Sequence, residues 1–390
     1  MEKVRLEDIG AFYTGLSGKS KEDFSDGNAL FVTYRNIYNN PVLNPNISDT
    51  VVVGKNEKQN EVLLGDILFT GSSETPEDAG MSSVVLHKPK EKMYLNSFCF
   101  GFRINDFNEV IPSYLGHLLR SPSIRAAISR TAFGVTRFNI NKKKFAEIEI
   151  PLPPLAIQQE IVSVLDSFTS LIEKMKEEVA LRKKQMEYYR EKLMEPKKDW
   201  EVKTLGEIGT FTRGTGIQKS DLIDEGFPCI HYGQIHTYYK TTIYKTKSFC
   251  KESLAKKLRK AKHGDLLIAT TSEDVEACCK AAVWLGNSDV AYSTDSFCYS
   301  HNQDPKYIAY LFQTETFAKN KRQAATGAKV VRVSGEAMES FSFAFPPLDQ
   351  QHRIASTLDL FETYITKMER LIELRQKQYE YYRDKLLTFE

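Results

Sequence analysis

The sequence predicts an α+β protein built as a twofold repeat, in which two mixed α/β domains are each followed by a long helix. Three observations lead to this fold class. A segment that begins near residue 153 recurs near residue 346, both copies carry a heptad pattern of apolar residues, and the regions before them alternate short apolar runs with polar turns. The predicted boundaries are 1–152 and 198–345 for the domains, and 153–197 and 346–390 for the helical segments.

The composition is that of a chain with more than one apolar core. The chain has 390 residues, of which 41% are hydrophobic, and 53 Lys and Arg against 51 Asp and Glu give a formal charge of +2. No run approaches the roughly 18 apolar residues of a membrane span, and residues 1–8 have no apolar stretch like that of a signal peptide. We therefore expect a cytoplasmic protein without a membrane partner.

Six cysteines are too few for a disulfide framework in a chain of this length, and they lack zinc-binding spacing. We expect reduced thiols that serve in packing.

The repeat is clearest in the helical segments. Residues 153–194 match residues 346–387 at a constant offset of 193, with 22 of 42 positions identical. Weaker upstream matches keep the same order: Gly65-Asp66-Ile67-Leu68 corresponds to Gly264-Asp265-Leu266-Leu267, and Ser97-Phe98-Cys99 to Ser296-Phe297-Cys298, both at an offset of 199. One arrangement therefore occurs twice, with variable regions between similar helices.

A heptad seam predicts that the two helices form a coiled coil. The spacing 4,3,4,3 connects Ile161, Leu165, Phe168, Ile172, Met175, Val179, Arg182, Met186, Tyr189 and Leu193, and the second copy repeats it from Ile354 to Leu386. Only a short segment separates the first helix from the second domain, so the second helix must run back along the first, which makes the pair antiparallel. About 40 residues give a rod of roughly 60 Å.

Two features of these helices have alternative interpretations. The seam is interrupted by Arg182 and Arg375, which either fix the register of the pair or extend their guanidinium groups to solvent. Secondary apolar stripes lie beside the seam, and either the attached domains or a separate protein covers them. Their members are Val164, Leu171, Leu181 and Tyr188 in the first helix and Leu371, Leu374 and Tyr381 in the second.

Positive charge is concentrated at the same position of both variable domains. No acid occurs between Glu109 and Glu147, an interval that holds Arg120, Arg125, Arg130, Arg137, Lys142, Lys143 and Lys144. None occurs between Glu315 and Glu336, beside Lys319, Lys321, Arg322, Lys329 and Arg332. A single run of this kind is usually a solvated face, but its recurrence favours contact with phosphates. A further basic segment, residues 240–262, belongs to the second domain alone.

A glycine turn lies inside each basic run, at residues 130–137 and 324–329. Glycine allows close approach of a backbone, and Arg and Lys contact phosphates or guanine. From these runs and turns we predict a DNA-facing surface made by Arg130, Thr136, Arg137, Lys142, Lys143, Lys321, Arg322, Lys329 and Arg332.

Two further pairs of loops are candidates for DNA contact. Each follows a short apolar strand, and Arg, Asn and Gln are the side chains that hydrogen-bond base edges bidentately. Taken singly, each is as easily a simple turn as a contact. The candidate residues are Tyr34, Arg35, Asn36, Ser72 and Ser73 in the first domain and Tyr232, Gln234, Thr271 and Ser272 in the second. Helices are expected at residues 113–129 and 305–318.

Motifs of enzyme chemistry are missing. Gly18-Lys19-Ser20 resembles the end of a phosphate-binding loop, but Tyr13 stands where its first glycine is required. No G-x-G-x-x-G, H-E-x-x-H or G-x-S-x-G motif occurs. We therefore predict no catalytic residue, no cofactor site and no metal site in this chain.

These motifs together resemble the specificity subunit of type I restriction-modification systems. The resemblance is carried by Pro-Pro-Leu-x-x-Gln at residues 153–158 and 346–351, by Glu-Tyr-Tyr-Arg-x-Lys-Leu at 187–193, repeated with Asp in the x position at 380–386, and by the Gly-Asp motifs at Gly65 and Gly264. It covers the whole chain. It implies two target-recognition domains, each reading one half of a bipartite, asymmetric double-stranded DNA site, and two similar helices that set the spacer.

The resemblance also implies partners. Two methyltransferase subunits would dock on the helices and bring S-adenosylmethionine, and restriction subunits with ATP- and Mg-dependent translocation could join them. Two other classes of function compete with this interpretation: a non-catalytic coiled-coil scaffold that displays two protein-binding domains, and a hydrolase with an unrecognised site. The matching acid-free runs disfavour the scaffold, and the absence of a nucleophile paired with a base disfavours the hydrolase.

Overall fold

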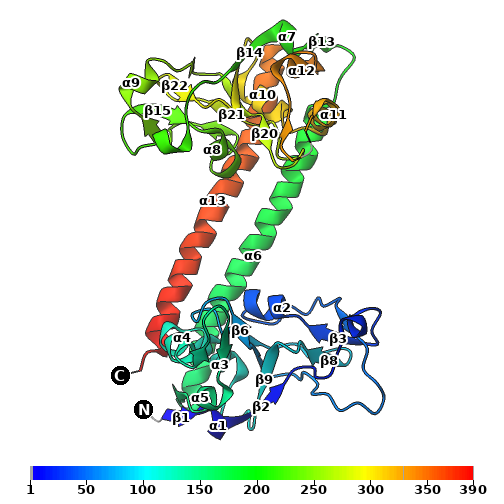
Figure 1. Cartoon of the computed structure of the whole chain (residues 1–390), viewed down its shortest axis with the longest axis vertical. Helices are drawn as coiled ribbons and strands as arrows, with labels where there is room; N and C mark the ends of the chain where they lie inside the picture. Colours follow the sequence, from blue (N-terminus) through cyan, green and yellow to red (C-terminus); the bar gives the residue numbers. More distant parts are fainter. Residues whose placement is uncertain (1–2, 328, 390) are drawn as a thin grey trace. The chain divides into compact units, whose positions relative to one another are not determined.

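A computed structural model describes residues 3–327 and 329–389, which form two compact units (Figure 1). The first unit comprises residues 1–176 and 370–390, and the second comprises residues 177–369. Each unit thus combines one variable domain with parts of both long helices. Ala328, in the predicted glycine turn of the second domain, lies outside the described residues.

The first unit contains four small sheets. Their strands are antiparallel except for the parallel pair β3–β8. In sheet order they are β1 (Lys3–Arg5) and β12 (Glu149–Pro151); β2 (Gly10–Thr14), β9 (Cys99–Ile104), β5 (Ile67–Thr70) and β7 (Ser82–Val84); β4 (Thr50–Val51), β3 (Ala29–Val32) and β8 (Met93–Leu95); and β10 (Ala132–Phe133), β11 (Phe138–Ile140) and β6 (Ser72–Ser73).

Short helices cover these sheets. They are α1 (Leu6–Ile9), the 3-10 helix η1 (Lys21–Phe24), α2 (Tyr34–Asn39), α3 (Pro112–Leu119), α4 (Pro122–Ser129) and α5 (Lys142–Ala146). Phe69, Phe100 and Phe145 pack against one another in the main core, with ring centroids 5.0–5.5 Å apart. Burial of such aromatic side chains is the main stabilising contribution in a domain of this size.

The second unit repeats this plan, with one more strand in two of its sheets and one fewer in the sheet β20–β24. The parallel pairs are β15–β22 and β16–β21. In sheet order the strands are β13 (Glu201–Thr204) and β25 (Ser342–Phe345); β14 (Gly209–Arg213), β23 (Ser296–His301), β19 (Leu266–Ala269), β21 (Lys280–Trp284) and β16 (Thr242–Ile243); β17 (Ser248–Cys250), β15 (Phe227–Ile230), β22 (Val290–Tyr292) and β18 (Lys260–Ala261); and β20 (Thr271–Ser272) and β24 (Val331–Arg332).

The short helices of the second unit occupy corresponding positions in the chain, except α9, which has no counterpart in the described part of the first unit. They are α7 (Leu205–Ile208), the 3-10 helix η2 (Lys219–Asp221), α8 (Tyr232–Thr237), α9 (Glu252–Ala255), α10 (Pro305–Leu311), α11 (Glu315–Ala324) and α12 (Gly335–Glu339). The predicted α+β class is therefore confirmed.

The two predicted coiled-coil helices are α6 (Leu155–Leu193) and α13 (Leu348–Leu387). In the first unit, Leu165 near the start of α6 shares a core with Tyr379 near the end of α13. In the second unit, Met186 near the end of α6 packs on the core that holds Leu358 near the start of α13. The two helices are therefore antiparallel, as the short connection between the first helix and the second domain predicts.

The arginines of the seam reach the helix surface. Arg182 donates to Glu178 Oε1 at 2.7 Å and to Gln185 Oε1 at 2.7 Å, and Arg375 donates to Gln378 Oε1 at 2.6 Å. All these partners are on the same helix as the arginine. The Arg182 guanidinium also lies 5.6 Å from the centre of the Tyr364 ring on α13. Arg375 thus fits a guanidinium that extends toward solvent, whereas Arg182 also contacts the paired helix.

The two helices predicted within the domains are each broken in two. The region predicted as one helix at 113–129 forms α3 and α4, because Pro122 cannot continue the first helix and instead begins the second. The region predicted at 305–318 is divided at Thr314, whose side chain accepts a hydrogen bond from the Phe317 amide and starts α11.

The Pro-Pro-Leu-x-x-Gln motif connects each domain to its helix. The buried side chain of Gln158 accepts from the Ile111 amide at 2.9 Å and donates to the carbonyls of Glu109 and Pro153, both at 2.8 Å. Gln351 accepts from the Asp304 amide at 3.0 Å and donates to the Pro346 carbonyl at 2.8 Å. Each glutamine thus joins the first turn of the long helix to the segment before the domain's own helix.

Two expectations about composition can be compared with this structure. All six cysteines are buried free thiols, which confirms their predicted role in packing. Across residues 3–327 and 329–389, none of the helices is both long enough and apolar enough to cross a membrane.

Candidate nucleic-acid interface

Three separate segments of the first domain converge on one surface depression. Tyr34 at the start of α2 donates from its hydroxyl to the Ser72 carbonyl at 2.8 Å, and Arg137 Nε donates to Ser72 Oγ at 2.9 Å. The Arg137 guanidinium also lies 5.3 Å from the centre of the Phe98 ring. The resulting cavity of about 670 Å³ is also lined by Ser73 and Thr136, and by the acids Glu74 and Asp78. Five predicted contact residues, Tyr34, Ser72, Ser73, Thr136 and Arg137, therefore line one site.

Local chain geometry explains this convergence. Strand β3 ends at Val32, and the next residue, Thr33, caps α2 because its hydroxyl accepts from the Asn36 amide at 3.3 Å. Strands β10 and β11 form a tight hairpin in which Gly134 has φ +138°, and a Cβ there would lie 2.0 Å from the Arg137 carbonyl oxygen. Only glycine fits this turn, which sets the position of Arg137 over Ser72.

The basic run of the first domain divides into structural and accessible members. Arg120 and Arg125 are partly buried and donate to backbone carbonyls, Arg120 to Ser82 at 2.5 Å and Arg125 to Gly80 at 2.6 Å. Burial lowers the pKa of Arg120 to about 10. Arg130 and Lys143 are exposed, and no described residue accepts a hydrogen bond or forms an ion pair with their side chains.

Lys142 is at the first turn of α5, which Asn141 caps through the Lys144 amide at 3.2 Å. Its ammonium lies 5.4 Å from the centre of the Phe100 ring, and partial burial lowers its pKa. Lys142 and Lys143 therefore begin the same short helix, close to the aromatic core of the domain.

The second domain brings the corresponding segments together. In the short sheet β20–β24, Thr271 lies opposite Arg332 and Ser272 opposite Val331. His236 of α8, the helix that Tyr232 begins, hydrogen-bonds the Thr271 carbonyl at 3.0 Å. The turn before β24 contains Gly327, which has φ +101°. Lys329 and Arg332 are exposed, and the side chains of both lack a bonding partner among the residues described.

Four further predicted contact residues, two from the loops and two from the basic run, also use their side chains inside the domain. Asn36 accepts from the Asn44 amide at 3.2 Å, and Gln234 accepts from the His231 amide and donates to Ser248 Oγ at 2.6 Å. These bonds occupy the side-chain amide groups of Asn36 and Gln234, which would otherwise be free to hydrogen-bond a base edge.

The other two belong to the basic run. Lys321 is buried and donates to the Glu276 carbonyl at 2.7 Å, while Arg322 pairs with the carboxylates of Glu276 and Glu315 at 2.9 and 2.8 Å. Both therefore have structural partners, in contrast to Lys329 and Arg332. Arg35 remains exposed beside Tyr34.

Sequence reasoning missed Phe98 and Tyr38, which line the depression of the first domain. Phe98 is 60% exposed although it is large and apolar. A signal for it was present, because Phe98 is the centre of the repeated Ser-Phe-Cys motif. No pattern pointed to Tyr38.

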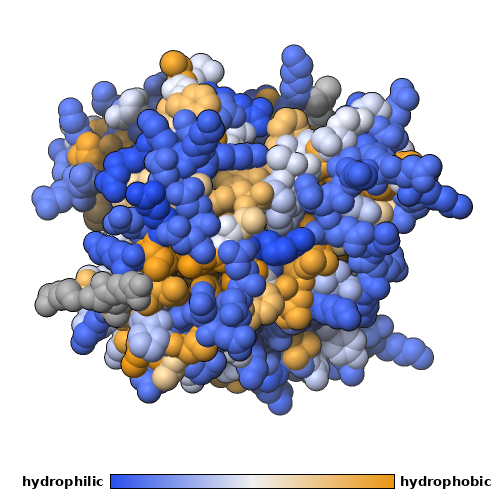
Figure 2. Space-filling model, turned by 90° about the horizontal axis from the view of Figure 1, so that it is seen from below, coloured by the Kyte–Doolittle hydropathy of each residue, from blue (hydrophilic) through white to orange (hydrophobic). Residues whose placement is uncertain are grey.

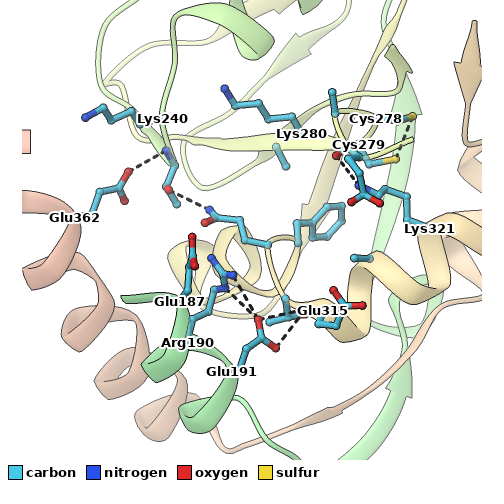
Figure 3. Close-up of a pocket in the computed structure, with 18 residues that line it drawn as sticks. Glu187, Arg190, Glu191, Lys240, Cys278, Cys279, Lys280, Glu315, Lys321 and Glu362 are labelled. Carbon is cyan, nitrogen blue, oxygen red and sulfur yellow. Dashed lines mark hydrogen bonds and ion pairs between the residues drawn. The ribbon is translucent and has the colours of Figure 1, made fainter. Parts of the chain in front are cut away.

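A second cavity, of about 620 Å³, lies where the end of α6 meets the second domain (Figure 3). Its ionisable lining includes five acids, Glu187, Glu191, Glu276, Glu315 and Glu362, and four bases, Arg190, Lys240, Lys280 and Lys321. Both carboxylate oxygens of Glu191 accept from the Glu315 amide at 3.2 Å, so α6 caps the start of α11. This mixed charge suits a junction between helix and domain.

Two buried thiols border this cavity. The Sγ atoms of Cys278 and Cys279 are 3.9 Å apart, and their hydrogen bond lowers the pKa of Cys278 and raises that of Cys279. Over the described ranges, no group of three or more His, Cys, Asp or Glu side chains is placed to hold a metal ion.

Each domain is also fixed to a long helix by a polar cluster. In the first unit, His117 of α3 bonds Asp166 of α6 at 2.8 Å and the Tyr379 hydroxyl of α13 at 3.0 Å. In the second unit, Tyr310 of α10 donates to Asp359 at 2.8 Å, and burial beside acidic groups raises its pKa. These contacts orient the domain surfaces relative to the adjoining helix.

The fold defines a class of protein: a repeated pair of mixed α+β domains, each followed by one long helix of an antiparallel coiled-coil pair. Comparison with known families gives the particular one. The family model for the type I restriction modification DNA specificity domain matches residues 1–181 and 197–376. The chain therefore belongs to this family, as a DNA-binding specificity subunit with two target-recognition domains.

Individual relatives agree with this assignment. A type I restriction enzyme specificity subunit of Haemophilus influenzae is 30% identical over 66% of this chain and 68% of its own length. The EcoR124I/EcoR124II specificity subunit of Escherichia coli is 31% identical over 64% of each chain.

A solved structure shows the same fold. It is the type I restriction-modification S subunit of M. genitalium, which matches with a TM-score of 0.58 at 14% identity and covers 100% of this chain and 96% of its own.

Proposed function

We propose that this chain reads a bipartite site in double-stranded DNA, with each target-recognition domain contacting one half-site. The observation that carries the proposal is the convergence, in each domain, of three segments that are far apart in sequence. In both domains exposed cations without an internal partner accompany this surface, as phosphate binding requires. Differences between the two surfaces support two different half-sites, and hence an asymmetric site.

The long helices are proposed to set the spacer between the half-sites. In support, α6 and α13 are continuous over 39 and 40 residues and pair in an antiparallel manner. A recognition protein that reads one face of the duplex needs half-sites about one helical turn apart, roughly 34 Å or 10 bp. Helices about 60 Å long exceed this separation, so they are long enough to hold two domains at least one helical turn of DNA apart.

The same helices are proposed to dock two methyltransferase subunits. Leu181 and Tyr188 of α6 are 51% and 58% exposed, and their repeat counterparts Leu374 and Tyr381 of α13 are 51% and 61% exposed. Residues seven apart share one face of a helix, so each pair makes an apolar patch. The attached domains leave these members of the secondary stripes uncovered, which supports a separate protein as their partner, and two equivalent patches support two copies.

Figure 2 shows apolar surface on the first unit, where hydrophobic side chains gather between hydrophilic ones in the view from below. Large apolar side chains exposed in this unit include Phe98, Phe133 and Leu155. Such exposure also supports a protein that works within a larger assembly.

Catalysis is proposed to belong to the partners. S-adenosylmethionine would be held by the methyltransferase subunits, and ATP and Mg by restriction subunits where these join the complex. The whole assembly would act in the cytoplasm, where genomic DNA is present. In this proposal the present chain contributes the choice of sequence and no chemical step.

Selection from random duplex DNA tests the proposal. The chain is purified with the methyltransferase subunits that co-purify with it and used to select binding sequences from a random pool. We expect enrichment of two defined half-sites separated by an unspecified spacer. Enrichment of a single continuous site, or of none, contradicts the proposal.

A further inference from the structure

The central residue of one short β ladder differs between the two domains. In the first domain, Asn139 of β11 lies directly opposite Phe133 of β10 and opposite Ser72 of β6. In the second domain, Arg332 lies opposite Thr326, through mutual backbone hydrogen bonds of 2.9 Å, and opposite Thr271 of β20. Asn139 and Arg332 are related by the repeat offset of 193, as are Phe133 and Thr326.

Strand alternation places both central side chains on the outer face of the ladder. Ile140 in the first domain and Val331 and Val333 in the second are buried, and these are the immediate neighbours of Asn139 and Arg332 in the chain. Because successive side chains of a strand point to opposite faces, Asn139 and Arg332 point away from the core. Both are exposed.

The outer face in the first domain is also the face of the candidate interface. Residues opposite each other in a ladder present their side chains on the same side, so Asn139 shares a face with Ser72. Arg137, two residues before Asn139, also lies on that side and donates to Ser72 Oγ at 2.9 Å. Asn139 is therefore next to the depression through its ladder partner Ser72, which is buried beneath Arg137, although Asn139 is not part of the lining.

Neither central side chain has a bonding partner within the domain. Among the residues that the structure describes, none hydrogen-bonds the side-chain amide of Asn139 and none pairs with the guanidinium of Arg332. The side chains of Asn36, Gln234 and Arg322 do have such partners. Their hydrogen-bonding groups are free for a ligand.

We propose that Asn139 and Arg332 are specificity-determining residues that read one base pair each, Asn139 an adenine and Arg332 a guanine. The proposal rests on the proposed function and adds which residues choose the base. An Asn amide pairs bidentately with N6 and N7 of adenine, and an Arg guanidinium with O6 and N7 of guanine, in the major groove. The same ladder position carries a different side chain in each domain. The two domains would therefore prefer different bases there.

The flanking residues fit this division. Phe133 in the first domain is 58% exposed, whereas Thr326, the second domain's counterpart, is a small hydroxyl residue. A phenyl ring beside Asn139 offers an apolar contact of the kind that fits a thymine methyl group. The second ladder instead places the long guanidinium between two threonines.

Exchange of the two central residues tests the proposal. Asn139→Arg and Arg332→Asn are introduced separately into the full chain and purified with the methyltransferase subunits. Binding is measured on the selected site and on every duplex that differs from it by one base pair. Lys319→Ala, an exposed cation of the second domain's basic run outside the ladder, is the matched control.

We expect Arg332→Asn to change the preference at one guanine of one half-site, and Asn139→Arg at one adenine of the other, by roughly 5- to 150-fold in relative affinity. Lys319→Ala keeps the ranking of all duplexes. The proposal is overturned if both exchanges leave that ranking unchanged.

If an exchange abolishes binding altogether, the variants Asn139→Ala and Arg332→Lys are measured in its place, because they change the side chain less. Under the proposal these variants flatten the preference at the same single positions. Uniform weakening at every sequence assigns the residues to phosphate contact and overturns it. Failure of the unaltered chain to select any site contradicts the proposed function instead, so the two failures are distinguishable.

Discussion

Phe168 of α6 stacks on Tyr382 of α13, with ring centroids 5.4 Å apart and planes 24° from parallel. In the second unit, Tyr189 stacks on Phe361 with centroids 5.6 Å apart and the same angle of 24°. At the repeat offset of 193, Phe168 corresponds to Phe361 and Tyr189 corresponds to Tyr382. The same aromatic contact therefore occurs once in each unit, with the two helices exchanging roles, as expected for similar helices packed antiparallel.

This stacking contact predicts the effect of Phe168→Ala. Phe168 is partly buried, so we expect the free energy of unfolding to fall by about 2–3 kcal/mol, somewhat less than for a fully buried phenylalanine. Denaturant unfolding followed by circular dichroism measures it. Tyr381→Ala is the control, because this exposed neighbour should change stability by less than about 0.5 kcal/mol. Equal effects of the two variants would contradict the assigned packing.

A pH dependence follows from His301. Burial lowers its pKa to about 4, against about 6.5 in an unfolded chain. Below pH about 6.5 the unfolded state binds a proton that the folded state does not, so stability is present above that pH and decreases as pH falls toward 4. Through His301, the free energy of unfolding is lowered by about 3 kcal/mol over this pH range.

His301→Asn isolates this contribution, because the amide oxygen can still accept from the Gln303 backbone, as His301 Nδ1 does at 3.3 Å. We expect the free energy of unfolding of the variant to vary less between pH 7 and pH 4. His352→Asn, at an exposed position, should keep the dependence of the unaltered chain. An unchanged pH profile in His301→Asn would refute the assignment.

The candidate interface predicts a division among the basic residues of the first domain. Lys143→Ala should weaken DNA binding at all sequences and reduce the slope of log K against log salt by about 0.9. Arg125→Ala should instead lower stability, because three backbone carbonyls lose their donor, and leave the salt slope unchanged. Fluorescence anisotropy at several salt concentrations distinguishes the two, and an identical slope for Lys143→Ala and the unaltered complex would count against the proposed surface.

The exposed helix patches predict the stoichiometry of assembly. Tyr188→Ala alone should leave one methyltransferase subunit bound per chain, and Tyr188→Ala with Tyr381→Ala should leave fewer than one. Sedimentation or native mass spectrometry of the purified complex measures this ratio. Leu64→Ala, at an exposed apolar position away from the long helices, is the control. Full occupancy in the double variant would exclude these patches as the docking sites.

The spacer role predicts the effect of shortening the helices. Removal of one heptad from α6 together with its counterpart in α13 keeps the seam in register, so the chain should still fold. The selected DNA site should then have a shorter spacer with the same two half-sites, or binding should be lost. Selection of the original site by a folded variant contradicts the role of the helices as a spacer.

The sequence predicted the parts of this structure that are encoded locally. The heptad spacing directly reflects helix packing, and the repeat offset showed which segments share a role. Convergence of Tyr34, Ser72 and Arg137 was not predictable, because it depends on the pairing of β6 with β11 across about 65 residues. Nor could Lys321 be separated from Lys329 by composition, since only the fold shows that Lys321 is buried and donates to the Glu276 carbonyl.

The central claim is that this chain chooses the DNA sequence on which a type I restriction-modification assembly acts. Mapping methylated adenines in the source genome, with the gene intact, deleted and restored, tests it most directly. The account predicts one bipartite motif with two defined halves that loses methylation on deletion and regains it on restoration. An unchanged set of methylated motifs in the deletion strain would contradict it.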